Sequence, residues 1–559
     1  MATSHLRVLS PSQSVDDMLT PKPVGFWHYR SYRLYLTLVM GLVIYANSIA
    51  RATLSIAIVC MVNSTASTIR SGKVVVNSSW LIDDEGCGGR RAPDIDYQGE
   101  QTWTSAEQSL LFSSIYWGGV VFALPAGVIA DRYSARLVVL FCLSLQALGC
   151  LLTPVTVEYG GLITLLVLRL VMGIGGQATI NPAIAVIING WIPASERSTV
   201  IGLYTGGNQI AFITSMPLNA WLCQQKHLLG GWPSIFYVSG LLTLLAMAPW
   251  AVFVTDTPQT NTWISKKELN YVEHSLRLHQ FGQAKSNIKR VPWMKIFMSM
   301  AVWSCIMGNF AATILACTLE SYIPTYFKQV LRLDLSSNGM LSAVPYMAQW
   351  VSKVLFALAA DMLKKKTTMS HTWICRVSNC LNTFAAGAFL VACAYADCTR
   401  TALAVSLLTL ANFMTSGQVT GYWTSLVSIA PPFTGIVNSL ARWSGQLASL
   451  IAPYIVGGVV VQGTAAEWRT VYFITVAGLC LTGLQFMTFG SAEVQDWAKL
   501  EGQPYASGVN HSDHTIKTEV HSDGGRQNGK GPGARSVTTV LSTGSSSCET
   551  ILTSVSEKY

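Results

Sequence analysis

Apolar runs of about 20 residues recur along this chain, separated by polar connections. A helix needs about 20 apolar residues to cross the hydrocarbon core of a bilayer, so runs of this length favour membrane-spanning helices. Composition agrees, because 50% of the 559 residues are hydrophobic and only 12% are charged, about half the charged fraction of a typical soluble protein. The sequence therefore predicts an all-α membrane protein embedded in the lipid bilayer.

We expect about twelve spans. They are placed near residues 34–62, 104–129, 137–155, 160–182, 199–222, 233–255, 299–326, 336–360, 372–394, 401–429, 433–462 and 468–490. The first run is too long for the apolar core of a cleavable signal peptide, so we expect it to remain as a span.

Lysine and arginine are concentrated in the connections after the even-numbered spans, as at Arg132 and Arg136. By the positive-inside rule, both termini are expected to be cytoplasmic and the 63–103 loop to lie outside. This loop carries N-glycosylation sequons at Asn63 and Asn77, and Asn77 lies farther from the predicted membrane. The membrane itself, whether plasma membrane or that of a vesicle or lysosome, is not defined by these patterns.

An internal repeat divides the chain into two halves. Phe122-Ala123-Leu124 precedes Ala130-Asp131-Arg132, and Phe356-Ala357-Leu358 precedes Ala360-Asp361, each after the second span of its half. Repeated halves around a central site are a transporter architecture. Two six-helix bundles are expected, at 31–256 and 299–491, joined by a central cytoplasmic loop at 257–298. A cytoplasmic N-terminal segment (1–30) precedes them, and a disordered cytoplasmic tail (492–559) follows them.

Several other classes of protein are excluded. The net charge of +9 does not indicate nucleic-acid binding, because the basic residues lie in short connections between apolar runs. No cofactor or metal is expected, since the thirteen cysteines form no zinc-type cluster. Cys87, Cys223 and Cys398 fall in predicted outer connections, where either a disulfide or free thiols would fit. An enzyme is not expected either, because the sequence shows no recognisable pair of nucleophile and base.

The segment Gly127-Val-Ile-Ala-Asp131-Arg132-Tyr-Ser-Ala-Arg136 resembles the signature loop of the major facilitator superfamily. The resemblance implies two pseudo-symmetric six-helix bundles. An aspartate at a helix end beside arginine can form a charged latch. The predicted latch residues are Asp131, Arg132 and Arg136, with Asp361 as the partner in the second half.

Further segments resemble solute carrier family 17, which includes sialin, sodium/phosphate cotransporter-like proteins and vesicular glutamate transporters. They are Arg51–Asn63, Pro182-Ala183, Trp191–Ser198, Gly231–Val238, Pro324–Phe327 and Gly339–Tyr346. The resemblance covers about 30–490, and the segments occur in the family's order. The resemblance indicates the family more strongly than the substrate; the expectation of a small anion rests on three mid-span arginines, Arg51, Arg169 and Arg442, against one acid.

Ionisable residues inside spans carry the chemistry of a transporter. Arg51 and Arg169 match arginines that bind or position the anion in vesicular glutamate transporters. Arg442 lies in the eleventh span, where those transporters have a neutral residue. The alternative is that each arginine bonds helix carbonyls or a single acid. Tyr204 and Asn208, one turn apart in the fifth span, are further candidates to bind substrate.

Glu320 is the only carboxylate well inside a predicted span. It either couples transport to a proton or neutralises a neighbouring cation. A third alternative is that the coupling ion is sodium and not a proton. Lys353 either faces the cavity or extends towards the cytoplasmic face. The glutamate transporters have histidine, glutamate and arginine where this chain has Phe112, Gly176 and Ala312.

The leading hypothesis is therefore a secondary active, ion-coupled transporter of a small carboxylate or phosphate anion that works by alternating access, as a monomer. Bidentate guanidinium groups suit such anions. A transport-deficient sensor or scaffold of the same fold and an anion channel are the two alternatives.

Overall fold

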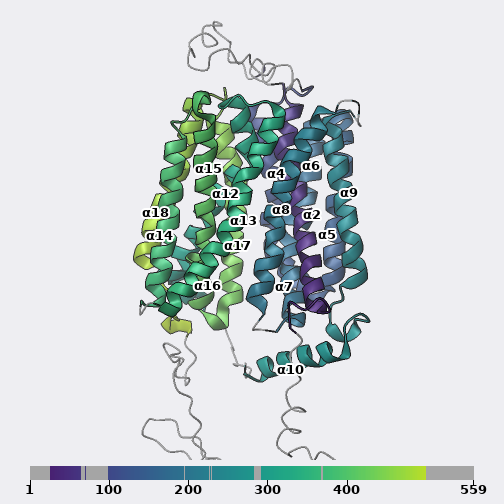
Figure 1. Cartoon of the computed structure of the whole chain (residues 1–559), viewed down its shortest axis with the longest axis vertical. Helices are drawn as coiled ribbons and strands as arrows, with labels where there is room; N and C mark the ends of the chain where they lie inside the picture. Colours follow the sequence, from purple (N-terminus) through teal and green to yellow (C-terminus); the bar gives the residue numbers. More distant parts are fainter. Residues whose placement is uncertain are drawn as a thin grey trace, which may run out of the picture. The chain divides into compact units, whose positions relative to one another are not determined.

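The computed structural model describes residues 25–63, 70, 99–193, 196–225, 227, 230–282, 291–366 and 369–498. Two bundles of long, nearly parallel helices make up this part of the chain (Figure 1). The first bundle contains α2 (Tyr32–Met61), α4 (Ser105–Arg132), α5 (Ala135–Val155), η3 (Thr156–Gly160), α6 (Gly161–Gly173), η4 (Ile174–Thr179), α7 (Ile180–Trp191), α8 (Arg197–Gln224) and α9 (Trp232–Phe253). The second contains α12 (Met300–Gln329), α13 (Leu335–Lys366), α14 (His371–Cys393), α15 (Thr401–Thr415), α16 (Tyr422–Ser428), α17 (Thr434–Val459) and α18 (Ala465–Phe489).

Each of the twelve predicted spans corresponds to one of these helices or to a nearly continuous run of them, so the predicted fold class is confirmed. Local sequence explains several boundaries. Thr104 and Thr464 form capping boxes with Glu107 and Glu467 that begin α4 and α18, because each pair satisfies backbone N–H groups that the first turn leaves free. The predicted tail at 492–559 lies almost entirely outside the described residues.

Seven described helical stretches are long and apolar enough to cross a membrane. Four long helices, α4, α8, α13 and α17, are outside this set. Besides the contact of α2 with α12, the bundles meet where α4 packs on α17 and α8 packs on α13. Their lower apolarity therefore reflects their position, because they line the contact between bundles instead of facing lipid.

The two ends of the helical bundles differ. The end that carries α10 (Lys266–Gly282) is called the α10 end here, and the opposite one, where α2 finishes at Met61, the far end (Figure 1). At the far end the bundles are joined, because Ser55 donates a hydrogen bond to the Ser321 carbonyl (2.8 Å) and the Lys328 ammonium donates to the Val59 carbonyl (3.0 Å). The molecule is thus closed at its far end.

A disulfide joins Cys60, near the end of α2, to Cys223, near the end of α8. Cys223 was one of three cysteines considered for a disulfide, but its partner is a residue that the sequence analysis placed inside the first span. Cys398 is disulfide-bonded as well, and Cys87 lies outside the described residues.

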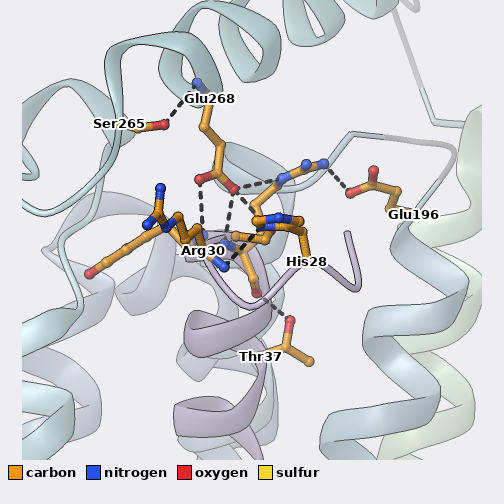
Figure 2. Close-up of polar contacts among 9 residues, drawn as sticks. His28, Arg30, Thr37, Glu196, Ser265 and Glu268 are labelled. Carbon is orange, nitrogen blue, oxygen red and sulfur yellow. Dashed lines mark hydrogen bonds and ion pairs between the residues drawn. The ribbon is translucent and has the colours of Figure 1, made fainter. Parts of the chain in front are cut away.

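The predicted central loop contains a helix that the sequence analysis missed. The Glu268 carboxylate of α10 accepts hydrogen bonds from the Ser31 hydroxyl and from the Arg33 guanidinium (3.0 Å), and Arg33 also pairs with Glu196 (Figure 2). The Arg33 and Glu268 side chains have no exposed surface. We call Arg33, Glu196 and Glu268 the α10 clamp, because they fix α10 to the start of α2.

Candidate functional site

A small cavity lies between the bundles, about halfway along the helices. Its lining comes from four helices of the first bundle and one of the second: Arg51, Phe112, Ile115, Tyr116, Arg169, Phe212, Glu320 and Ser321. The two arginines that the sequence singled out on separate spans therefore share one cavity with the single predicted coupling carboxylate.

Arg51 is held by residues of two other helices. Its guanidinium donates one hydrogen bond to the Asn208 side-chain oxygen of α8 (2.7 Å) and another to the Glu320 carboxylate of α12 (3.2 Å). Asn208 also accepts a hydrogen bond from Ser48 (2.7 Å), which fixes the orientation of its amide. The Arg51–Glu320 pair crosses between the bundles, so one ion pair connects the halves at the cavity.

Arg169 has different surroundings. It is 3% exposed, and its Nε donates to the Leu111 carbonyl (3.0 Å). Among the described residues it forms no ion pair with a carboxylate. A charge in the middle of a membrane costs at least about 2.5–3.5 kcal/mol unless it faces a partner or a cavity. Arg169 faces the cavity, and no carboxylate in the described part of the chain balances its charge.

The charges of the cavity do not balance. Arg51 and Arg169 contribute two positive charges and Glu320 contributes one negative charge. A guanidinium can bind a carboxylate or a phosphate through two parallel hydrogen bonds. The cavity is therefore electrostatically complementary to a small anion, which would supply the missing negative charge.

Glycine at position 176 allows a polar pair to form beside this site. A Cβ atom at Gly176 would lie 1.6 Å from the Gln146 side-chain nitrogen and 2.5 Å from the Asn47 oxygen, and these two side chains form a hydrogen bond of 2.8 Å. Gly176 lies in the π-helical segment η4, a type of irregularity that is frequent at functional sites. The family resemblance places a glutamate residue of the glutamate transporters at this position. Here the same space holds the neutral Gln146–Asn47 pair.

A glycine in the fourth span allows two helices to approach closely. A Cβ atom at Gly173 would lie 1.8 Å from the Ile115 carbonyl oxygen of α4, so only glycine permits this contact. The contact brings α6, which carries Arg169, against α4, which supplies Phe112 and Tyr116 to the cavity. The rings of Phe112 and Tyr322 meet across the bundles at a tilt of 53°, with their centroids 4.8 Å apart.

The remaining cations predicted in spans lie outside the cavity lining. Arg442 is exposed on α17 and Tyr204 is buried on α8, and neither lines the cavity. Lys353 does not extend freely towards a membrane face, because its ammonium donates to the Gln209 side chain of α8 (2.9 Å). Ala312, where the family resemblance implied an arginine, is buried in the second bundle.

The predicted latch is only partly described. Arg132 is exposed at the end of α4, and the side chains of Asp131 and Asp361 lie outside the described parts of the chain. The Arg136 backbone donates to the Asp256 carboxylate (2.9 Å) beyond the end of α9, a contact within one bundle that the sequence analysis missed. Asn63 follows α2, and its backbone N–H donates to the Gln101 carbonyl (2.9 Å), whereas Asn77 is outside the described residues.

Two pairs of residues were missed because the partners are remote in the sequence. Glu268 is 235 positions from Arg33, and Gln146 is 99 positions from Asn47. A signal was available for Glu268. A charged residue at the start of a span, together with an amphipathic run in a loop, indicates a helix that packs against that span. For Gln146, a polar residue in an apolar run was the corresponding signal.

Comparison with known proteins agrees with this architecture. Residues 40–453 match the family described as Major Facilitator Superfamily. The D-xylose–proton symporter has a similar structure, with a TM-score of 0.57 and 14% sequence identity, covering 83% of this chain and 99% of that one. The chain belongs to the major facilitator superfamily.

Similar sequences narrow the assignment. A Drosophila melanogaster protein named as an inorganic phosphate cotransporter is 31% identical over 469 residues, covering 83% of this chain and 86% of its relative. Human sialin is 29% identical over 453 residues, covering 80% of this chain and 87% of sialin. Within the superfamily, these relatives place the chain in solute carrier family 17, as the sequence motifs predicted.

Proposed function

We propose that this protein is a secondary active transporter of a small organic or inorganic anion, a carboxylate or a phosphate, and that it couples transport to protons through Glu320. The observation that carries the proposal is the buried Arg169, which faces the cavity and forms no ion pair with any carboxylate that the structure describes. The similarity to a phosphate cotransporter supports the same class of substrate. Alternating access would follow from rocking of the two bundles around the cavity.

Glu320 is suited to coupling because its carboxylate occupies Arg51, a residue that would otherwise bind the substrate anion. It pairs with Arg51 at 3.2 Å, and its side chain is 20% exposed. Protonation would remove its charge and release Arg51 to bind the anion, so that proton and substrate bind together. This sequence of events makes Arg169 the first contact of the anion and Arg51 the second.

The test is uptake into proteoliposomes that contain the purified protein. Labelled phosphate and a panel of carboxylates, including glutamate, would be offered under a proton gradient and, separately, under a sodium gradient. Arg169→Gln should abolish flux. Arg400→Gln, on an exposed residue at the far end, should leave flux unchanged. Absence of saturable flux with every anion would leave a sensor or scaffold, whereas currents far above carrier rates would indicate a channel.

The coupling step has its own test. Glutamine has the shape of a protonated glutamate but cannot release a proton. Glu320→Gln should therefore keep exchange of anion across the membrane and lose accumulation driven by a proton gradient. Accumulation that responds only to sodium, or that survives in Glu320→Gln, would refute proton coupling through this residue while leaving anion transport intact.

We further propose that the α10 end is cytoplasmic, since Lys266 and Lys267 lie there and basic residues favour the inner side. This orientation places the 63–103 loop outside, where Asn77 can be glycosylated. Loss of a glycosidase-sensitive mass shift in Asn77→Gln would support it, and a wild-type protein from mammalian cells without any such shift would count against it.

A further inference from the structure

A second cavity lies on the outer surface of the first bundle, away from the site between the bundles. It has a volume of about 320 Å³ and lies at the α10 end, between the start of α2, the last residue of α9 and the connection from α9 to α10. Its lining residues are Arg30, Tyr32, Tyr35, Val39, Phe253 and Trp263. We call it the α2–α9 groove.

We propose that the α2–α9 groove binds an anionic phospholipid, with the phosphate at Arg30 and an acyl chain along Tyr35, Val39 and Phe253. The transport chemistry does not use this groove. None of its lining residues lines the central cavity.

The apolar part of the groove faces the surroundings of the protein. Trp263 is 61% exposed and Tyr35 is 53% exposed, and both are types of residue that are enriched where membrane helices meet the head-group region. Tyr35 and Val39 are four residues apart, so they lie on one face of α2. This face continues from the head-group level at Arg30 into the hydrocarbon region, as a bound acyl chain requires.

The groove is pre-formed by hydrogen bonds in its floor and walls. The Tyr32 hydroxyl donates to the Phe253 carbonyl and accepts from the Asn261 side chain (3.0 Å). The Asn261 side-chain oxygen accepts from the Trp263 backbone (2.8 Å), and the Trp263 and Phe253 rings meet edge to face at 5.6 Å. The polar atoms of the floor are thereby satisfied, which leaves an apolar surface for a hydrocarbon chain.

The rim of the groove is positively charged. Among the described residues Arg30 forms no ion pair, and its guanidinium contacts the Tyr29 ring at 5.3 Å. The nearby carboxylate of Glu268 is already engaged by Arg33. The exposed Lys266 and Lys267 follow Trp263 closely in the chain. A phosphodiester would supply the negative charge that this rim lacks, whereas a zwitterionic lipid would not.

The proposed orientation agrees with this occupant. The cytoplasmic leaflet is the one that carries anionic lipid, and each lysine or arginine near its surface attracts such lipid by about 1 kcal/mol. That contribution corresponds to about a fivefold change in binding. Because one wall of the groove is the start of α2 and the other includes Phe253 of α9, a bound lipid would also hold these two helix ends together.

The experiment measures lipid retention by the full-length protein in native mass spectrometry. Detergent-purified protein would be titrated with phosphatidylserine, phosphatidylcholine, glycerophosphoserine or inorganic phosphate. We expect retention of phosphatidylserine in preference to the other three. Arg30→Gln should lower this retention about fivefold, and Trp263→Ala should lower it as well.

Two matched variants serve as controls at the far end. Arg400→Gln removes an exposed arginine and Trp221→Ala an exposed tryptophan, and both should retain phosphatidylserine as the wild type does. Unfolding temperatures in phosphatidylcholine alone would confirm that the variants are folded. Equal retention of phosphatidylcholine, unchanged retention in both groove variants, or equal binding of free phosphate would overturn the proposal.

Discussion

The ion pair between Arg51 and Glu320 can be tested with a double-mutant cycle on stability. The variants are Arg51→Gln, Glu320→Gln and the double R51Q/E320Q. At the observed separation of 3.2 Å, two unit charges in an effective dielectric of about 20 attract by about 5 kcal/mol. The side chains are 19% and 20% exposed, and removing them from water offsets much of this attraction. We therefore expect a coupling free energy of about 1–3 kcal/mol.

The structure also predicts the order of the variants. Glu320→Gln leaves two guanidinium groups in one cavity without any described carboxylate, so it should be the least stable. Arg51→Gln should be milder, because Glu320 then faces Arg169. The double variant should unfold at a higher temperature than Glu320→Gln in a thermal denaturation series in detergent.

The control cycle combines Glu320→Gln with Ser48→Ala. Ser48 contacts the same Asn208 that binds Arg51, at 2.7 Å, but carries no charge. Its loss should cost about 1 kcal/mol and should add to the effect of Glu320→Gln with little coupling. If the shifts of Arg51→Gln and Glu320→Gln were additive as well, the ion pair would not contribute and the reasoning would be wrong.

Three further predictions concern stability elsewhere in the molecule. Arg33→Gln should destabilise the protein by about 3–5 kcal/mol, because it leaves the buried Glu268 without its partner. Limited proteolysis should then cut the connection between α9 and α12 faster than in the wild type. Lys267→Gln, at an exposed residue, should behave as the wild type. Gly176→Ala should lower the unfolding temperature, since its Cβ would collide with Gln146, whereas Gly202→Ala meets nothing within 4 Å and should be neutral or stabilising by up to about 1 kcal/mol. Cys223→Ser should destabilise by about 2–5 kcal/mol. Because Cys60 is buried, thiol labelling is done on denatured protein: Cys60 should be labelled in Cys223→Ser and not in the unreduced wild type. Labelling of Cys60 in the unreduced wild type would contradict the disulfide.

The fold was accessible from sequence because the bilayer imposes a length and a polarity on every span. Both properties are local, so the positions of the twelve spans, the two halves and the arginines could be recognised residue by residue. The two arginines of the first bundle converge on one cavity, and the carboxylate of the seventh span meets them there. Their pairing could not be predicted, since it depends on distances between helices that no spacing in the chain encodes.

The contacts that were not anticipated share one cause. Gln146 bonds Asn47 because Gly176 leaves space between their helices, and Cys60 bonds Cys223 because α2 and α8 pack side by side. Gln146 and Cys223 can be noticed in their own segments, but nothing in the sequence names the partner of either. Only the packing of α2 against α5 and α8 gives them partners.

The disulfide has a mechanical consequence for a molecule that must move. Both of its sulfur atoms belong to the first bundle, on α2 and α8. A covalent bond across the bundles at the far end would lock the carrier shut, whereas this one leaves the boundary between the bundles free. The far-end contacts across that boundary in the described residues are noncovalent: hydrogen bonds such as Ser55 to Ser321, and apolar packing of Ile58 and Met61 in one cluster with Tyr322. At the far end the first bundle is therefore held together covalently, while the two bundles remain free to separate.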